Sequence, residues 1–194
     1  MSPPDWTQVL RPIIELFNEL GVRYQVGGSL ASSAWGLPRS TQDADLVADL
    51  EFQHIDPLVA RLHGAYYIEA SMIQEAIVRH SAFNILHLDT MLKVDIFIPE
   101  LTAYDEATFH HARTQSLGEP HGEQALFTSP EDIVLHKLLW YKAGGDISER
   151  QWLDVLGVLK VQAEDLDAAY LQEWGTRLGV SELLARAWQE AGLR

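Results

Sequence analysis

The pattern of hydrophobic and polar positions changes near residue 128. Before that point short β-rich runs alternate with segments of helical apolar spacing, and after it every segment has helical spacing. Strands are predicted at 23–26, 45–50, 82–88 and 91–98. Helices are predicted at 6–20, 29–35, 56–63, 71–80, 130–141, 148–160, 165–178 and 181–191. This order predicts an α+β fold, with a core at residues 1–127 and a C-terminal helical subdomain at 128–194.

Turn and cap residues refine two of these boundaries. Asp89 and Thr90 separate the last two predicted strands and indicate a β-hairpin. Ser71 stands at the start of the helix at 71–80, where its hydroxyl is expected to cap the first turn.

Composition excludes several classes of site. At 194 residues and 47% hydrophobic, the chain can bury a core, and its size favours one domain with an appended subdomain. It has no cysteine, which excludes disulfides, thiolate zinc sites and cysteine nucleophiles. The first residues lack the basic and apolar regions of a signal peptide, and no apolar run approaches the roughly 18 residues that span a bilayer. We therefore expect a cytoplasmic protein with no membrane partner.

The net charge of −14, from 28 acidic and 14 basic side chains, argues against a protein that binds the phosphate backbone of nucleic acids broadly. Most of the acidic residues are interpreted as solvated helix surface. The same charge also fits a site that concentrates divalent cations.

Three aspartates in predicted strands are candidate metal ligands. Asp43 and Asp45 are two residues apart, so in a strand their carboxylates point to the same side. Asp95 is flanked by Val94 and Ile96 in an otherwise apolar strand, where a charge is costly unless it is paired or bound to metal. If the two strands are neighbours, the three carboxylates meet and supply the hard oxygen ligands that two magnesium ions need.

A phosphate-binding turn is predicted just before this acidic pair. Gly27 and Gly28 let the backbone turn tightly and approach a ligand closely. Ser29 then begins a helix whose free N–H groups and positive dipole end favour phosphate. Taken alone, the glycines also fit a plain strand-to-helix connection, and Asp43 and Asp45 also fit a cap or a turn.

In this order, Gly-Gly-Ser, Asp-x-Asp and a later strand aspartate resemble the nucleotidyltransferase superfamily of DNA polymerase β. The similarity runs through VGGSLASSAWGLPRSTQDADL and again through FNILHLDTMLKVDIF. It implies a mixed β-sheet core with flanking helices and a C-terminal helical bundle that completes the active site.

A second segment, SPEDIVLHKLLWYKAGGDISERQWLDVLGVL, is similar to the helical part of minimal bacterial nucleotidyltransferases of the AbiEii type. These are grouped with toxins of toxin–antitoxin and abortive-infection systems. In that group a lysine and an aspartate on successive helices reach the active site, and the matching positions here are Lys137 and Asp154. The resemblance implies a transfer RNA acceptor end as one target, and a cognate antitoxin as a partner.

The resemblance also implies roles for these residues in nucleotidyl transfer from a nucleoside triphosphate. Asp43 and Asp45 would hold two magnesium ions, and Asp95 would bind the catalytic ion and serve as general base. Gly28 and Ser29 would bind the β- and γ-phosphates. Lys137, Asp154 and Arg39 are candidates for the remaining positions: Lys137 for a triphosphate oxygen, Asp154 to orient Lys137 or the acceptor, and Arg39 for the triphosphate.

Each of these side chains also has a structural interpretation. Lys137 fits a surface lysine lying along its apolar neighbours, and Arg39 fits an exposed loop arginine. Asp154 fits a helical ion pair with Arg150, four residues earlier. Asp95 fits a core residue paired with Lys93 on the same strand face.

Histidines and tryptophans add no further site. His110 and His111 are adjacent, so their side chains diverge and make a poor metal chelate. His87 is interpreted as a hydrogen-bonded structural residue. The tryptophans of the C-terminal helices are interpreted as packing anchors rather than base-stacking platforms: Trp140, Trp152, Trp174 and Trp188.

From the residues and the resemblance together we expect a magnesium-dependent nucleotidyltransferase. Its acceptor is left open between RNA, as for a toxin-like enzyme, and a small-molecule or protein hydroxyl, as for antibiotic-modifying enzymes with the same core. The alternatives are a catalytically silent nucleotide-binding regulator and a DNA-binding accessory protein. The scattered lysines and arginines make the last of these the weakest.

Overall fold

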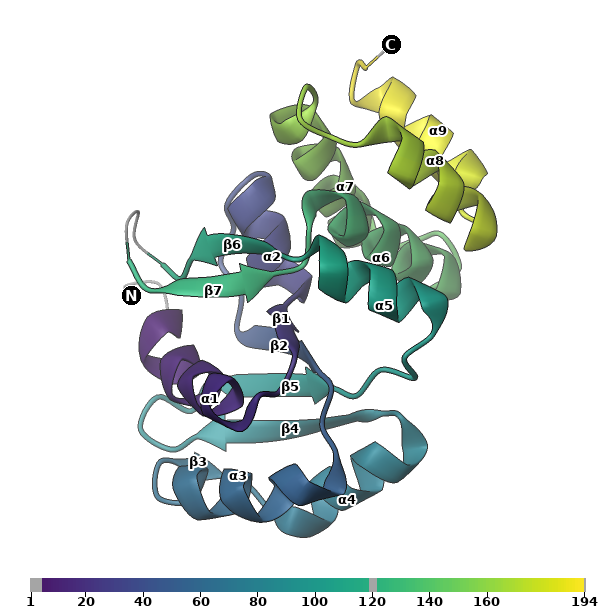
Figure 1. Ribbon diagram of the computed structural model, residues 1–194. Helices are drawn as coiled ribbons and strands as arrows, with labels where there is room; N and C mark the ends of the chain where they lie inside the picture. Colours follow the sequence, from purple (N-terminus) through teal and green to yellow (C-terminus); the bar gives the residue numbers. More distant parts are fainter. Residues whose placement is uncertain (1–4, 119–121, 194) are drawn as a thin grey trace. The chain divides into compact units, whose positions relative to one another are not determined.

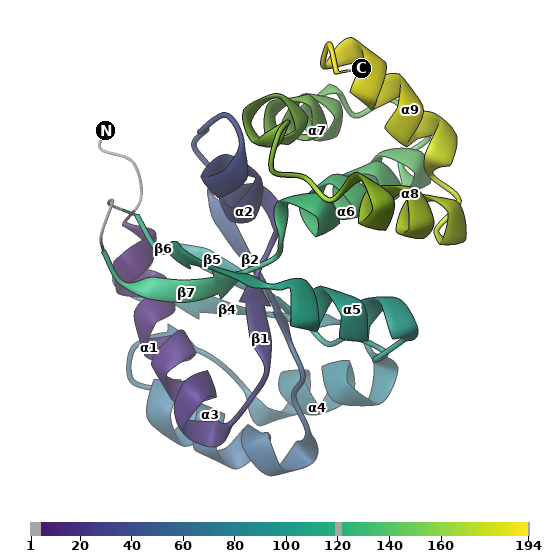
Figure 2. The ribbon, with the colours of Figure 1, turned by 45° about the horizontal axis from the view of Figure 1, so that its top comes forward.

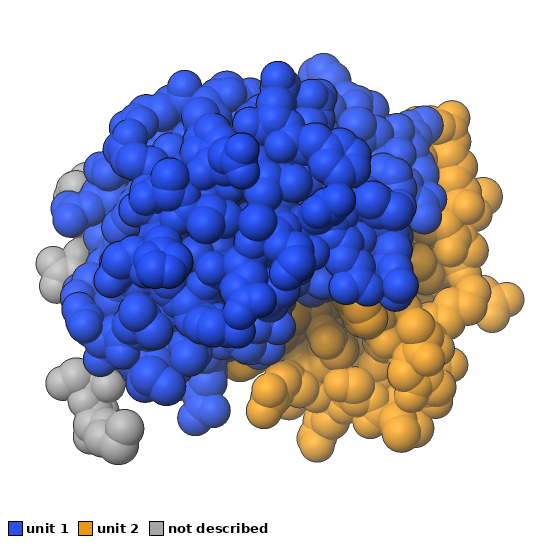
Figure 3. All heavy atoms as spheres, turned by 90° about the horizontal axis from the view of Figure 1, so that it is seen from below, with its two compact units in different colours: residues 1–27, 40–127 blue, residues 28–39, 128–194 orange. Residues whose placement is uncertain are grey.

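The computed structural model describes residues 5–118 and 122–193, which form an α+β protein with a seven-stranded mixed sheet (Figure 1). This part of the chain divides into two compact units (Figure 3). Unit 1 holds the residues up to Gly27 together with Ser40–Phe127, and unit 2 holds Gly28–Arg39 and the residues from Thr128 onward.

Unit 1 contains the whole sheet, in the order β3-β4-β5-β2-β1-β7-β6. Its neighbours β2 and β5 are parallel, as are β1 and β7, and the other pairs are antiparallel. The strands are β1 (Tyr24–Val26), β2 (Asp43–Ala48), β3 (Tyr66–Tyr67), β4 (Ala82–His87), β5 (Lys93–Phe97), β6 (Arg113–Ser116) and β7 (Gln124–Phe127).

Helices cover one face of this sheet. The helices of unit 1 are α1 (Trp6–Leu20), α3 (Ile55–Leu62), α4 (Ala70–Arg79) and α5 (Ala103–His111), with a 3₁₀ turn η1 (Phe52–His54). Of these, α1, α3 and α4 lie together on one side of the sheet (Figures 1 and 2). The buried Tyr66 of β3 donates its hydroxyl to the carbonyl of Val9 in α1 at 2.7 Å, which ties that layer to the sheet edge.

Burial alternates strictly along the two central strands. In β2 the buried positions are Ala44, Leu46 and Ala48, and in β5 they are Val94 and Ile96. The positions between them are half-buried. Because side chains alternate along a strand, the apolar set forms the core on one face and leaves the aspartates on the other.

Unit 2 is helical. It consists of α2 (Gly28–Trp35), α6 (Pro130–Ala143), α7 (Glu149–Gln162), α8 (Ala168–Arg177) and α9 (Ser181–Glu190). Helix α2 packs against α6 and α7, so it groups with the C-terminal helices although most of unit 1 lies between them in the sequence. Caps fix the helix starts: Ser129, Ser148 and Asp167 each accept a hydrogen bond from a backbone N–H of the first turn.

Two sequence-based expectations need correction. Ser71 does not cap α4, because the helix already begins at Ala70 after Glu69, which makes no side-chain cap. The elements β3, α5, β6 and β7 were not predicted. Strand β3 is two residues long, and α5 buries only Tyr104 and Thr108, so neither gives a clear hydrophobic period. None of the described helices is both long and apolar enough to cross a bilayer.

Candidate active site

Four charged side chains share one face of the sheet in unit 1. In the parallel pair of β2 and β5, Asp43 is opposite Lys93 and Asp45 is opposite Asp95. Each strand contributes residues two apart, which point to the same side. We call these four residues the carboxylate face. The neighbouring strands place the three aspartates side by side, which confirms the adjacency that the sequence left conditional.

Two of the aspartates of the carboxylate face have a partner of opposite character, a cation for Asp95 and a hydroxyl donor for Asp43. Lys93 Nζ lies 2.7 Å from Asp95 Oδ2, and Thr41 donates its hydroxyl to Asp43 Oδ1 at 2.8 Å. The hydrogen bond to Asp95 raises the pKa of Lys93, and the charges of Asp43 and Asp45 act in the same direction. The Lys93 ammonium is thus a cation held among three carboxylates.

The backbone register places the three predicted carboxylates on neighbouring strands. Their side chains, however, are not arranged around a metal site. Within residues 5–118 and 122–193, no group of three or more histidine, aspartate or glutamate side chains is arranged to hold a metal ion. Asp95 faces the ammonium of Lys93 instead. The donor set nevertheless fits a hard divalent cation, because it consists of carboxylates and already holds a cation.

The predicted glycine turn lies at the end of β1. Gly27 is buried, and its N–H donates to the carbonyl of Asp45 at 2.8 Å, which extends the β1–β2 ladder. Gly28 begins α2 with φ of +53°, a left-handed conformation that favours glycine. Ser29 follows in the first turn of α2, where backbone N–H groups have no intrahelical partner.

Four side chains of unit 2 form a connected charged group, which we call the Arg39–Asp154 cluster: Ser29, Arg39, Lys137 and Asp154. Arg39 binds Asp154 through two parallel hydrogen bonds, Nε to Oδ1 at 2.9 Å and Nη2 to Oδ2 at 3.0 Å. Lys137 Nζ lies 2.9 Å from the same Oδ2. Arg39 Nη2 also donates to Ser29 Oγ at 2.5 Å.

The two members of the cluster that lie on α6 and α7 are buried. The side chains of Lys137 and Asp154 are each 7% exposed, and that of Arg39 is 26% exposed. Burial alone would raise the pKa of Asp154, but the hydrogen bonds and charges of Arg39 and Lys137 outweigh it and lower the pKa. With two cations and one anion, the cluster carries a formal charge of +1.

The structure corrects three interpretations made from the sequence. Lys137 is not a surface lysine, because it is buried and paired. Arg39 is not an exposed loop arginine, because Asp154 and Ser29 hold it. Asp154 pairs with Arg39 and Lys137, while Arg150 is exposed to solvent. Arg39 and Lys137 therefore both contact Asp154, and Arg39 also contacts Ser29.

The backbone of the turn before Arg39 lies very close to the backbone of α7. A Cβ added to Gly36 would lie 2.8 Å from the backbone nitrogen of Val158, and one added to Gly157 would lie 3.3 Å from that of Leu37. Trp35 anchors the same turn, since its ring nitrogen donates to the carbonyl of Thr128 at 2.8 Å. Sequence reasoning missed both glycines, because their role is a close approach between residues about 120 positions apart in the sequence.

Two buried carboxylates at the start of α6 were also missed. Glu131 and Asp132 are fully buried. Glu131 accepts a hydrogen bond from the backbone N–H of Asp167 at 3.0 Å, and Asp132 accepts one from the hydroxyl of Tyr170 at 2.9 Å. Burial and the charge of Asp132 raise the pKa of Tyr170, so its phenol remains a donor. These bonds join the start of α8 to α6 and are structural.

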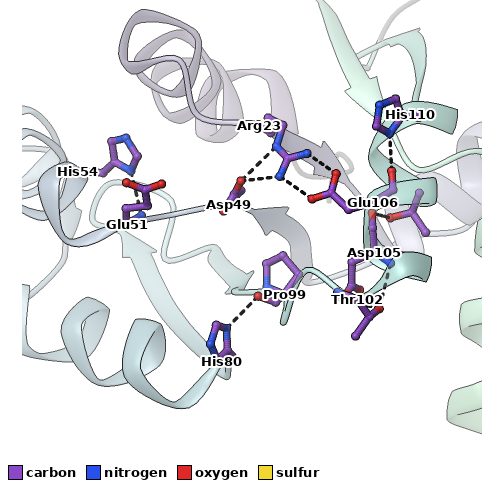
Figure 4. Close-up of polar contacts among 11 residues, drawn as sticks. Arg23, Asp49, Glu51, His54, His80, Pro99, Thr102, Asp105, Glu106 and His110 are labelled. Carbon is purple, nitrogen blue, oxygen red and sulfur yellow. Dashed lines mark hydrogen bonds and ion pairs between the residues drawn. The ribbon is translucent and has the colours of Figure 1, made fainter.

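A separate polar group lies at the other ends of β1 and β2 (Figure 4). Arg23, just before β1, forms hydrogen bonds with Asp49, just after β2, and with Glu106 of α5. His110 Nδ1 donates to the carbonyl oxygen of Glu106 at 2.7 Å. These contacts fasten α5 to the sheet.

Among the predictions for the remaining aromatic residues, two are confirmed and one is wrong. His87 is confirmed as structural, because it is buried and its Nδ1 lies 2.8 Å from Thr90 Oγ1. Trp152 is buried and packs against Tyr141, as expected of an anchor. Trp140 is 61% exposed, so its interpretation as a packing anchor is wrong.

No protein-family model matches the sequence, and no curated protein matches it. Solved structures do match the fold. ANT(2″)-Ia in complex with adenylyl-2″-tobramycin is 13% identical, with a TM-score of 0.59 over 90% of this chain and 97% of that one. The chain has a nucleotidyltransferase fold.

Two further solved structures share this nucleotidyltransferase fold. An antigenic nucleotidyltransferase-like protein from Paracoccidioides brasiliensis is 14% identical, with a TM-score of 0.56 over 95% of this chain and 92% of that one. The putative nucleotidyltransferase TM1012 from Thermotoga maritima is 18% identical, with a TM-score of 0.51 over 79% and 96%. The predicted fold class is thereby confirmed.

Proposed function

We propose that this protein transfers a nucleoside monophosphate from a nucleoside triphosphate to a hydroxyl group of an acceptor, in a magnesium-dependent reaction. The observation that carries the proposal is the register of β2 and β5, which sets three aspartates on one face of a sheet. The nucleotidyltransferase fold supports it, since the solved structures with this fold include ANT(2″)-Ia in complex with adenylyl-2″-tobramycin. Two magnesium ions are the proposed cofactors, held by Asp43, Asp45 and Asp95.

The reaction forms a bond between the acceptor oxygen and the α-phosphorus and breaks the bond from that phosphorus to the leaving pyrophosphate. Bound magnesium supplies charge neutralisation for the triphosphate. Asp95 is the proposed general base and takes the proton of the acceptor hydroxyl onto a carboxylate oxygen. This assignment is supported by the position of Asp95 on β5, on the side of β2 away from β1 and the glycine turn.

The triphosphate is assigned to the start of α2 and to the Arg39–Asp154 cluster. Gly28 and Ser29 offer the N–H groups of a helix N-terminus, which favour anions. Because Ser29 Oγ accepts a hydrogen bond from Arg39, the hydroxyl proton of Ser29 is left to donate to a phosphate oxygen. Lys137 supplies positive charge, and Asp154 orients both cations. In this assignment Arg39 acts on the triphosphate through Ser29.

A small-molecule hydroxyl is the proposed acceptor. The net charge of −14 disfavours an RNA backbone and favours a neutral or cationic compound. ANT(2″)-Ia, which shares the fold, was solved with adenylyl-2″-tobramycin. An RNA acceptor, which the AbiEii-like segment containing Lys137 and Asp154 suggests, is the second candidate.

The test is incubation of the protein with magnesium and each α-³²P-labelled nucleoside triphosphate, together with either total RNA or a small-molecule extract. We expect pyrophosphate release and label in the small-molecule fraction. Asp43→Asn should reduce pyrophosphate release and labelling by roughly a hundredfold or more, because it removes a proposed metal ligand. Asp89→Asn, at an exposed position of the β4–β5 turn, is the control that changes charge equally. Label in RNA would select the RNA acceptor, and triphosphate binding without turnover on any fraction would make the protein a silent regulator.

A further inference from the structure

We propose that Lys93 is a built-in counter-cation of the carboxylate face, which binds Asp95 and is displaced when a divalent cation binds. The inference rests on the proposed function, because it concerns the metal site assigned there. Its basis is the contact of Lys93 Nζ with Asp95 Oδ2 at 2.7 Å, on a face that also carries Asp43 and Asp45.

The position of Lys93 in the sheet explains why its ammonium occupies this place. It lies two residues before Asp95 on β5 and directly opposite Asp43 on β2, so its side chain emerges among the three carboxylates. Strand β5 pairs with β2 on one side and β4 on the other, which fixes its backbone. Without a cation, like charges this close would repel one another. Lys93 supplies that cation within the chain.

The two partners differ in how easily they can move. The Lys93 side chain is 44% exposed and flexible, so it can turn into water at small cost. The Asp95 side chain is 19% exposed and short, so it stays on the face. A divalent cation binds carboxylate oxygens more strongly than an ammonium does, because it carries twice the charge. The exchange therefore releases Lys93 into solvent and leaves Asp95 Oδ2 to the divalent cation.

A purely structural role for the pair makes a different prediction. If Lys93 and Asp95 only stabilised the strands, removing Lys93 would leave divalent-cation affinity unchanged or lower it. If Lys93 competes with the cation, removing it must increase affinity. The sign of the change tests whether Lys93 opposes cation binding, and the side-chain signal of Lys93 tests whether it is displaced.

The experiment measures Mn²⁺ binding to the full chain without nucleotide, from the electron paramagnetic resonance signal of free Mn²⁺. Lys93→Gln should bind Mn²⁺ roughly tenfold more tightly than the unmodified protein, because a neighbouring positive charge and a competing ion pair are both removed. Lys93→Arg keeps the charge and should stay close to the unmodified protein. Arg79→Gln removes one charge from an exposed pair with Glu75 in the same unit and is the matched control.

A second measurement follows Lys93 itself. The sequence has four lysines, and Lys93 is the one in unit 1. Its side-chain NMR signal should shift on addition of Mg²⁺, and the shift should disappear in Asp43→Asn. An unmoved signal would contradict displacement.

The outcomes distinguish this inference from the proposed function. Equal or weaker Mn²⁺ binding by Lys93→Gln, or an equal gain in Arg79→Gln, overturns the inference alone when Asp43→Asn still abolishes binding. No Mn²⁺ binding by any variant overturns both the inference and the metal dependence of the proposed reaction. Tighter binding by Lys93→Gln in a protein that labels no acceptor supports the inference and overturns the proposed function.

Discussion

Removing the charge of Asp154 should destabilise unit 2 more than any other single change in the Arg39–Asp154 cluster. Asp154→Asn keeps the shape of the side chain but leaves Lys137, whose side chain is 7% exposed, without its carboxylate partner. Breaking a buried ion pair by removing one partner costs about 3–5 kcal/mol, because the remaining charge stays desolvated. We expect the lower half of this range, since Asn still accepts a hydrogen bond and Arg39, at 26% exposure, can reach water.

Urea unfolding followed by tryptophan fluorescence measures this effect. Five of the six tryptophans lie in unit 2, so the signal reports mainly on that unit. A loss below about 1 kcal/mol would show that the pair is in effect exposed. Lys137→Met combined with Asp154→Asn should recover about half of the loss, because no buried lysine is left unpaired. A double variant as unstable as the single one would refute the electrostatic explanation.

The pH dependence gives a second check on Asp154. Its pKa in the folded protein is lowered from the ordinary value of 3.8. Its ionisation therefore stabilises the folded state fully above pH 3.8, and this contribution is lost as the pH falls through the lower folded value. The difference in unfolding free energy between the unmodified protein and Asp154→Asn should be constant near neutral pH and shrink in acid. A difference that grew as the pH fell would contradict the assignment.

Two further predictions concern the residues around this cluster. Gly36→Ala should destabilise unit 2 by about 1–3 kcal/mol, because its Cβ would lie 2.8 Å from the backbone nitrogen of Val158; an unchanged urea midpoint would contradict the close approach. Ser29→Ala should raise KM for the nucleoside triphosphate roughly tenfold through one lost hydrogen bond, with little loss of stability. Steady-state kinetics against Ser81→Ala, an exposed serine of unit 1, would check this, and an unchanged KM would remove Ser29 from the triphosphate site.

The sequence was sufficient to predict an element where that element has its own hydrophobic periodicity or a capping residue. The strands β4 and β5 and the helices α6, α7, α8 and α9 lie within a few residues of their predicted bounds, because each has a clear apolar pattern or a capping residue. Elements whose stability comes from neighbours were missed. Strand β6 pairs with β7, β7 also pairs with β1, and Arg23 holds α5 through Glu106.

The candidate site was predictable in its residues but not in its contacts. The spacing of Asp43, Asp45 and Asp95 sets which way each carboxylate points once its strand forms. Whether these strands are neighbours depends on sheet order, which local sequence does not encode. The pairing of Arg39 with Asp154 joins residues 115 positions apart.

The sequence by itself determined the alternation that buries one face of β2 and β5, the placement of three aspartates on the opposite face, and the left-handed glycine that begins α2. These follow from backbone geometry, which acts over a few residues. Only the tertiary structure decided that Lys93 neutralises Asp95, that Lys137 is buried, and that Arg39 binds Ser29 and Asp154. Such contacts depend on which distant elements pack together, and on the energetic need of every buried charge for a partner.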